Sequence, residues 1–265
     1  MSEGPTDEKT GIDFTEVDYF INEYSGQNAY EGLLLLKDDS NKDDVGLNYR
    51  LANACYILAN CSKEWEQRKA YLLEGYGYIK TAYANEPTNT EVLHWAPIIT
   101  GSLSENCTAT KERIQFGHEF KKYIDQAISL LPPEFALLHM RGRFRYEVAS
   151  LSFVERNLAM LFFGTPPSAS YKEALEDLLA AENMDPGAID NMLYIGKTYH
   201  ALGDAKNARK WLTKVTKKES CDCVDTEQIE EAHTLLGKLP SPTPEELADD
   251  SDCDTAEGIG GEESD

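Results

Sequence analysis

Residues 186–220 constrain the fold more than any other stretch, because their apolar and small residues recur with the period of paired helices. Gly196 and Ala208 are small where the two helices of a hairpin would cross, which lets the backbones approach closely. Gly203-Asp204 between them is typical of one helix ending at a glycine and the next beginning at an aspartate cap. Larger side chains fill the predicted seam between the helices: Met192, Ile195, Tyr199, Leu212 and Val215.

This spacing is that of a 34-residue tetratricopeptide unit, which cannot bury its apolar face alone and therefore needs neighbouring units. Weaker copies of the pattern precede it. Each has an alanine five residues before a proline that ends the second helix. These pairs are Ala82 with Pro87, Ala127 with Pro132, and Ala181 with Pro186. The matching first helices are predicted at residues 45–61, 90–104 and 134–149.

The three prolines lie 45 and 54 residues apart rather than 34. We therefore expect insertions of roughly 10 to 20 residues in the turn between the two helices of each early hairpin. One insertion, Ser150–Ser170, is too apolar for a plain surface loop and is predicted to form an extra helix. Its large side chains are expected to pack on the array, or to close a groove partly: Phe153, Leu158, Leu161 and Phe162.

The predicted fold class is all-α, a tetratricopeptide-like helical-hairpin solenoid with insertions, over one domain at residues 13–239. Two short helices, near residues 14–24 and 27–38, are expected before the first hairpin. Thr226–Lys238 is expected to form a last amphipathic helix that covers the apolar end of the array.

The net charge of −22 belongs mostly to the two ends of the chain. Residues 1–44 carry 12 acids and 3 bases, and residues 240–265 carry 10 acids and no base. Residues 1–12 and the acidic tail 240–265 are expected to be disordered. Nucleic-acid binding is not expected, because it needs clustered bases. With no apolar run of 18 residues and a polar N-terminus, the chain is expected to be cytoplasmic, without a transmembrane segment or presequence.

The sequence lacks the motifs of catalysis, which favours a binding protein over an enzyme. It has no glycine-rich phosphate loop, no nucleophile elbow and no His-Glu-x-x-His, and its five histidines lack ligand or triad spacing. Cys221 and Cys223 are the only close cysteine pair, and no second pair completes a zinc site. We expect free thiols, and no catalytic, cofactor-binding or metal-binding residue.

A binding groove is expected along the first helices of the hairpins, as in other repeat arrays. Counted from Gly196 and its upstream equivalents, the groove positions mix basic, aromatic and aliphatic side chains. They are Arg50, Leu93, His139, Arg143, Tyr146, Leu193, Lys197 and His200. Such a groove suits an acidic peptide or a lipid with a phosphate head. The alternative is that these bases pair with neighbouring acids and recognise nothing.

A second basic surface is predicted on the last repeat helix, with lysines four residues apart: Lys206, Lys210, Lys214 and Lys218. Arg209 and Lys217 lie alongside them. It would suit an acidic surface such as tubulin, or an anionic lipid. The alternative, which the sequence alone favours, is a solvated face whose cations lie near a helix C-terminus.

The acidic tail contains three candidate phosphorylation sites. Ser241 and Thr243 each precede a proline, and Ser251 is followed by acidic residues. The tail is expected to fold back onto the basic groove, more so when phosphorylated.

Several of these segments together resemble the regulator of microtubule dynamics protein family. The resemblance covers about residues 14–239 and is most specific between Gly142 and Pro186. It rests on His94-Trp95, Arg113-Ile114-x-x-Gly117-x-x-Phe120-Lys121, Gly142-Arg143-Phe144-x-Tyr146-x-Val148-Ala149-x-Leu151-Ser152-Phe153-x-Glu155-Arg156, and Pro166-Pro167-x-Ala169-x-Tyr171-x-Glu173-Ala174-Leu175.

The resemblance implies a non-enzymatic helical adaptor associated with microtubules or a microtubule-associated protein, with spindles and spindle poles, and with chromosome segregation. Other members of the family carry an N-terminal membrane anchor and act at organelle contacts, where lipid binding is attributed to the helical domain. Because no anchor precedes residue 14, tethering by a transmembrane helix of this chain is not expected. A lipid-binding module with an amphiphilic basic groove is the alternative function.

Overall fold

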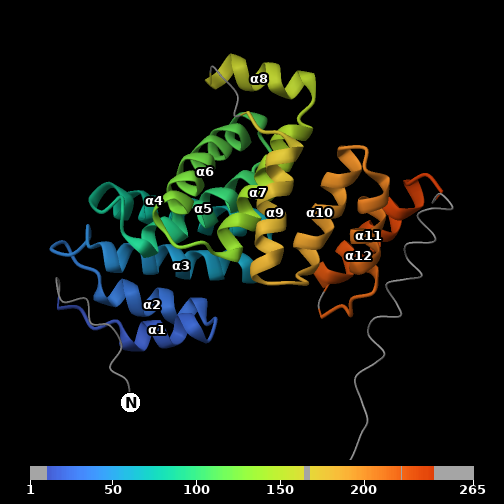
Figure 1. Cartoon of the computed structure of the whole chain (residues 1–265). Coiled ribbons are helices and arrows are strands. Elements are labelled where there is room, and N and C mark those ends of the chain that lie inside the picture. Colours follow the sequence, from blue (N-terminus) through green and yellow to red (C-terminus); the bar gives the residue numbers. More distant parts are fainter. Residues whose placement is uncertain (1–10, 164–167, 222, 242–265) are drawn as a thin grey trace, which may run out of the picture. The chain divides into compact units, whose positions relative to one another are not determined.

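The computed structural model describes residues 11–163, 168–221 and 223–241. Throughout this part of the chain the regular structure is helical, with twelve helices and no strand, as the all-α prediction requires (Figure 1). The helices group into two compact units, where the sequence predicts one domain. Unit 1 comprises residues 1–141 and 150–168, and unit 2 comprises residues 142–149 and 169–265.

Unit 1 is built from consecutive helices, among which the pairs α3–α4 and α5–α6 pack most extensively. Its helices are α1 (Thr15–Asn22), α2 (Gly26–Leu36), α3 (Val45–Cys61), α4 (Trp65–Asn85), α5 (Thr90–Glu105), α6 (Thr110–Leu130), the first half of α7 (Phe135–Ser150), and α8 (Phe153–Phe163). The predicted first helices of the hairpins are therefore confirmed as α3, α5 and α7.

The predicted insertions in the turns of the early hairpins are wrong. Residues 62–64 join α3 to α4, and residues 106–109 join α5 to α6, so both turns are short. The additional length lies in the helices themselves, since α4 and α6 have 21 residues each. A helical hairpin can contain longer helices, because the added turns lengthen the contact between the two helices at the end away from the connecting turn and leave their closest approach in place. Between Pro132 and Pro186 the prediction is right: α8 lies between α7 and the next helix.

The helices of unit 1 are linked by tyrosine hydroxyls that donate across 43 or 44 residues of sequence. The pairs are Tyr30 with Glu74, Tyr76 with Glu119, and Tyr83 with Gln126. The first joins α2 to α4, and the other two join α4 to α6. This spacing is close to the 45 residues that separate the starts of α3 and α5, so the α2–α4 contact has a counterpart one hairpin later in the α4–α6 contacts. Burial, reinforced by the hydrogen bonds to Glu74 and Glu119, raises the pKa of Tyr30 and of Tyr76.

Unit 2 contains the second half of α7, α9 (Tyr171–Met184), α10 (Ile189–Ala201), α11 (Ala205–Thr216) and α12 (Cys223–Lys238). The well-phased repeat is the α10–α11 hairpin, and its close crossing is confirmed. A Cβ atom added at Gly196 would lie 2.8 Å from Leu212 Cγ. Gly203 has φ +80°, and the Asp204 side chain accepts from the Asn207 amide at 3.0 Å, so the predicted turn is also correct.

The α12 helix covers the open side of this hairpin, as expected of a terminal cap. Ala232 of α12 is fully buried and belongs to one apolar cluster with residues of α10 and α11. That cluster contains Met192, Leu193, Ala208, Leu212, Val215, Ala232 and Leu239.

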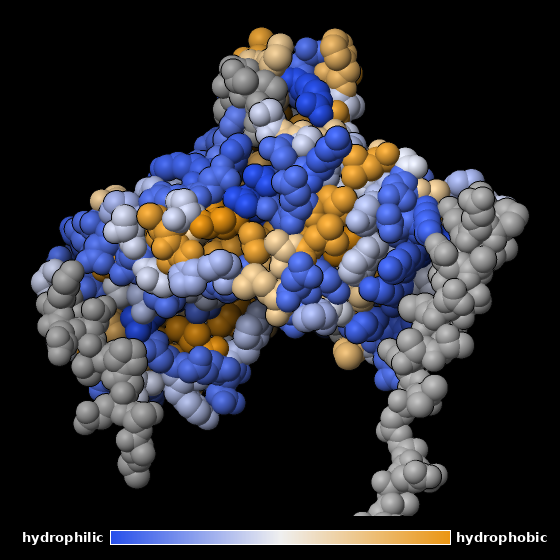
Figure 2. Space-filling view, viewed as in Figure 1, coloured by the Kyte–Doolittle hydropathy of each residue, from blue (hydrophilic) through white to orange (hydrophobic). Residues whose placement is uncertain are grey.

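The predicted extra helix exists as α8, but its role differs from the expectation. Phe153 and Leu161 are exposed, and Leu158 is half-buried. Figure 2 shows hydrophobic surface on α8 at the top of the view. Nothing is described for the side chain of Phe162. Packing of this helix on the array therefore uses other residues, chiefly the buried Ala159.

The predictions of disorder at the two ends fall largely outside the described residues. Of the N-terminal segment, Ile12 is described, and it packs against the apolar cluster of α1, α2 and α3. Of the tail, Pro240 and Ser241 are described, and both are exposed. Among the described residues, none of the helices combines the length and the apolar character that crossing a membrane requires.

Candidate partner-binding surfaces

Arg50, predicted to point into a groove, is instead part of the core of unit 1. Its side chain is 6% exposed, and its guanidinium forms a two-pronged pair with Asp18 of α1: Nε lies 2.6 Å from Oδ1 and NH2 lies 2.9 Å from Oδ2. The same group lies over the rings of Phe14 and Tyr49. Because α1 covers this part of α3, Arg50 holds the two helices together and does not face a ligand.

Leu93 and His139, also predicted in the groove, are buried as well. Leu93 is fully inaccessible in α5, and His139 stacks on Phe135 in α7 with ring centroids 5.6 Å apart. Both positions therefore belong to the packed interior and are not open to a ligand.

In unit 2 the structure does bring three predicted groove residues together, around a tyrosine that the sequence analysis missed. Arg143 of α7 lies 5.0 Å from the ring centroid of Tyr194, and Lys197 Nζ lies 4.6 Å from the same centroid. Tyr146 meets Tyr194 edge-on, with centroids 5.5 Å apart. Cations over aromatic faces stabilise such an arrangement by about 0.5–1 kcal/mol each near a surface. We call these four residues the aromatic–cation cluster.

The charges of the aromatic–cation cluster have partners within unit 2. Lys197 Nζ lies 2.8 Å from a Glu231 carboxylate oxygen of α12, and the Tyr194 hydroxyl donates to Glu147 at 3.1 Å. Burial raises the pKa of Tyr194 to about 12, and it also raises that of Tyr146. The cluster therefore joins α7, α10 and α12, which favours the interpretation that these bases pair internally.

The two remaining predicted groove residues, both on α10, lie in different environments. Leu193 is 2% exposed and lies in the apolar cluster with α11, whereas His200 is exposed near the end of α10. Tyr194 escaped the sequence count because it follows Leu193 and falls outside the groove positions. A signal was present, since Tyr194 and Lys197 are three residues apart and share one helix face.

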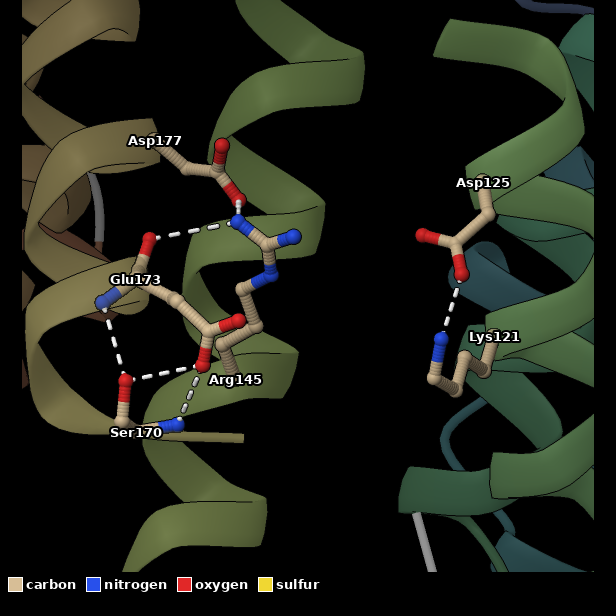
Figure 3. Close-up of polar contacts among 6 residues, drawn as sticks. All are labelled: Lys121, Asp125, Arg145, Ser170, Glu173 and Asp177. Atoms are coloured by element: carbon tan, nitrogen blue, oxygen red, sulfur yellow. Dashed lines mark hydrogen bonds and ion pairs between the residues drawn. The ribbon is translucent and has the colours of Figure 1, made fainter. Parts of the chain in front are cut away.

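A further ion pair in unit 2 was also missed, because its two residues lie 32 positions apart (Figure 3). Arg145 NH1 of α7 lies 2.7 Å from Asp177 Oδ2 of α9, and the Asp177 side chain is 6% exposed. Ser170 and Glu173 form a capping box at the start of α9, with reciprocal side-chain to backbone hydrogen bonds. In unit 1, the pair Lys121–Asp125 is an ordinary (i, i+4) surface contact.

The predicted basic stripe lies on α11, with its cations on the solvent side. The buried face of this helix consists of Ala208, Leu212 and Val215, and the helix contains no acidic residue. The exposed side chains are those of Lys206, Lys210, Lys214, Lys217 and Lys218, the last two just beyond the helix end. We call these five lysines the α11 stripe.

Arg209, predicted as part of the stripe, is half-buried and has a different role. Its NH2 group donates to the carbonyl of Pro240, where the acidic tail begins. Of the candidate phosphorylation sites, Ser241 is exposed next to this contact, whereas Thr243 and Ser251 lie outside the described residues. Within the described part of the chain, no three His, Cys, Asp or Glu side chains gather as metal ligands.

Comparison with known proteins gives one family. The family model described as regulator of microtubule dynamics protein 1-3 matches residues 13–240. The chain is 33% identical to regulator of microtubule dynamics protein 1 of Caenorhabditis elegans over 72% of this chain and 84% of that protein. It is 33% identical to regulator of microtubule dynamics protein 2 of Homo sapiens, over 74% of this chain and 48% of that protein.

The rat relative, regulator of microtubule dynamics protein 3 of Rattus norvegicus, is 32% identical over 82% of this chain and 47% of its own length. The chain thus spans most of the nematode protein and about half of the two mammalian proteins. A solved structure titled MamA MSR-1 C2 superposes with a TM-score of 0.50 at 13% identity, covering 82% of this chain and 94% of that one. At that identity the likeness supports the helical-repeat fold alone.

Proposed function

Since the chain belongs to the regulator of microtubule dynamics protein family, as its sequence resemblance indicated, we propose that it is a non-enzymatic helical adaptor that associates with microtubules. It acts in the cytoplasm on the cytoskeleton, at the spindle and spindle poles, and supports chromosome segregation. The partner is tubulin itself or a microtubule-associated protein. The names of the relatives support the microtubule link.

The single observation that supports a microtubule-binding surface is the α11 stripe. Three of its lysines are exposed on one helix that holds no acid of its own, and the other two follow directly after the helix. A microtubule presents an acidic surface, so complementary charge favours docking there. The aromatic–cation cluster offers less to a partner, because Lys197 is paired with Glu231 and is itself 17% exposed.

The charge of the whole chain opposes this association. With a net charge of −22, the chain is repelled by an acidic filament at distances beyond a local contact. Binding therefore depends on a local patch of opposite sign. Salt screens both the attraction and the repulsion, with a Debye length of about 8 Å at physiological ionic strength.

Co-pelleting of the purified full chain with stabilised microtubules, over a salt series, tests this proposal. The variant Lys210→Glu/Lys214→Glu reverses two charges in the α11 stripe and should weaken pelleting on the order of tenfold at low salt. The control Lys42→Glu/Lys63→Glu makes the same change of net charge at exposed lysines of unit 1. Equal losses in both variants would assign the effect to net charge and contradict a local site.

Lipid binding, the alternative function from the sequence, is not part of this proposal. It requires aliphatic groove residues that a ligand can reach. Leu93 is fully buried and Leu193 is 2% exposed. The apolar residues of the predicted amphiphilic groove are therefore buried in the protein's own core and cannot contact a lipid.

A further inference from the structure

The α8 helix exposes large apolar side chains, unlike an ordinary surface helix. The exposed fractions are 80% for Phe153, 66% for Val154, 53% for Met160 and 75% for Leu161. Its charged residues Glu155 and Arg156 are only partly exposed. A surface helix normally turns its apolar stripe to the core and its charges to water.

Of the charged residues of α8, Glu155 contacts α6, and both Glu155 and Arg156 contact the turn that precedes α8. Glu155 accepts from Arg113 of α6 at 3.1 Å and from the Ser152 backbone amide at 2.9 Å. Arg156 Nε donates to the Leu151 carbonyl at 3.2 Å. Among the described side chains of α8, the small Ala159 is the buried one. The side of α8 that carries Ala159 therefore faces its own unit, and the opposite side is apolar and exposed.

The outer side of α8 is symmetric about one residue, Asn157, which is itself exposed. The four apolar residues stand four and three positions before Asn157 and three and four positions after it. At 100° per residue these five positions share one face of the helix. Reversing the direction of the helix leaves the order unchanged: two apolar residues, an asparagine, two apolar residues.

We propose that the outer face of α8 is a self-association surface, on which a second copy of this chain docks its own α8 antiparallel about a two-fold axis through Asn157. In this arrangement Phe153 and Val154 of one copy meet Met160 and Leu161 of the other, and the two Asn157 amides face each other. A carboxamide both donates and accepts, so it forms hydrogen bonds with its own copy. A contact that uses the same patch on both copies is the geometry of a two-fold dimer.

The charges of α8 favour a second copy over a membrane. A helix that lies in a membrane surface usually carries an excess of lysine and arginine on its polar side. Here the polar side has one acid and one base, and the chain carries a net charge of −22. A central asparagine is a feature of helix pairs, where one polar residue in an apolar seam fixes register and number of strands.

The area of the patch predicts a weak dimer. Four side chains of this size, exposed to this extent, offer roughly 450 Å² per copy, against about 800 Å² per partner in a standard stable interface. We therefore expect a reversible dimer whose dissociation constant lies in the micromolar range or above.

A charge exchange at residue 157 tests the two-fold contact in the full chain. Sedimentation velocity over a concentration series should show the native chain associating. At concentrations at which the native chain dimerises, Asn157→Asp and Asn157→Lys should each be monomeric, because two like charges at residue 157 would then face each other across the two-fold axis. An equal mixture of the two variants should associate again, at least as strongly as the native chain.

Two further samples complete the experiment. Asn22→Asp adds the same charge at an exposed residue of α1 and should dimerise like the native chain. Phe153→Ser/Leu161→Ser should be monomeric and should keep the native circular dichroism spectrum, since both side chains are exposed. A native chain that stays monomeric at millimolar concentration overturns the proposal, as does a mixture that fails to associate. Binding of that monomer to neutral phosphatidylcholine vesicles, abolished by Phe153→Ser/Leu161→Ser, would assign the face to a membrane instead.

Discussion

Gly142 is the residue at which the packing of unit 2 is most sensitive to a single added carbon. A Cβ atom at this position would lie 2.7 Å from Leu178 Cγ, 2.8 Å from Leu178 Cδ2 and 3.2 Å from Leu178 N. Non-bonded carbons prefer about 3.5–4.0 Å, so the added methyl group is nearly 1 Å too close. Leu178 is fully buried and cannot turn its side chain into solvent. The change Gly142→Ala therefore forces α7 and α9 apart.

The expected size of this effect is a balance of two terms. Overpacking a rigid core destabilises by about 1–3 kcal/mol. Alanine gains about 1 kcal/mol over glycine inside a helix. Because one close contact involves the Leu178 backbone, we place the overpacking term at its upper end and expect a net loss of about 1–2 kcal/mol. Denaturant unfolding followed by circular dichroism at 222 nm measures it through the shift in midpoint.

Two companion variants isolate the cause. Gly77 of α4 is exposed, and a Cβ atom there meets nothing within 4 Å, so Gly77→Ala should stabilise the chain by about 0.5–1 kcal/mol. In a Leu178→Ala background, which removes the two side-chain contacts and leaves the 3.2 Å contact to the backbone, the loss caused by Gly142→Ala should shrink to less than about half of its value in the native chain. A Gly142→Ala protein as stable as the native one would refute the close crossing of α7 and α9.

Three other outcomes follow from the same contacts. Arg145→Met removes the guanidinium that lies 2.7 Å from the Asp177 carboxylate, whose side chain is 6% exposed. Discounted for the partial exposure of Arg145, the loss in free energy of unfolding should be about 2–3 kcal/mol, and a loss below about 0.5 kcal/mol would contradict a buried pair. The folded-state pKa of Tyr194 is raised to about 12, so this tyrosine ionises first in the unfolded chain, and the free energy of unfolding should fall as the pH rises above 10. The variant Tyr194→Phe should make that fall less steep in unfolding experiments, and an unchanged slope would count against the burial of Tyr194. Deleting residues 242–265 removes ten acids that follow the Arg209–Pro240 contact in the sequence. Microtubule pelleting of the shortened chain should be stronger than that of the native chain at low salt and equal to it at high salt. Equal pelleting of the two chains at low salt would exclude interference by the tail.

Local patterns in the sequence were sufficient to place the helices. The alanine five residues before each proline predicted where α4, α6 and α9 end, to within about three residues. Gly203-Asp204 predicted the α10–α11 turn, which the structure confirms. Such features depend on backbone sterics and capping within a few residues, so one sequence suffices to recognise them.

The candidate groove could not be predicted in the same way, because it depends on which helix covers which. Arg50 has a groove position by count, yet it is buried against Asp18 of α1, 32 residues away. Arg145 pairs with Asp177 at the same separation. No local pattern encodes such contacts.

For α8, by contrast, the relevant pattern was present in the sequence, but its interpretation was wrong. Its hydrophobicity was visible in the sequence and was interpreted as packing, since apolar residues are usually inside. The deciding fact is which side of the helix faces its own unit. The structure places Ala159 on that side, which leaves Phe153 and Leu161 exposed to solvent.

The most direct measurement of the proposed function compares microtubule co-pelleting of the native chain, Lys210→Glu/Lys214→Glu and Lys42→Glu/Lys63→Glu at low and at high salt. The proposal predicts that the native chain and the unit 1 variant pellet at low salt, that the α11 variant stays in the supernatant, and that high salt removes the difference. A native chain that fails to pellet at any salt concentration, with or without cell extract, would contradict association with microtubules.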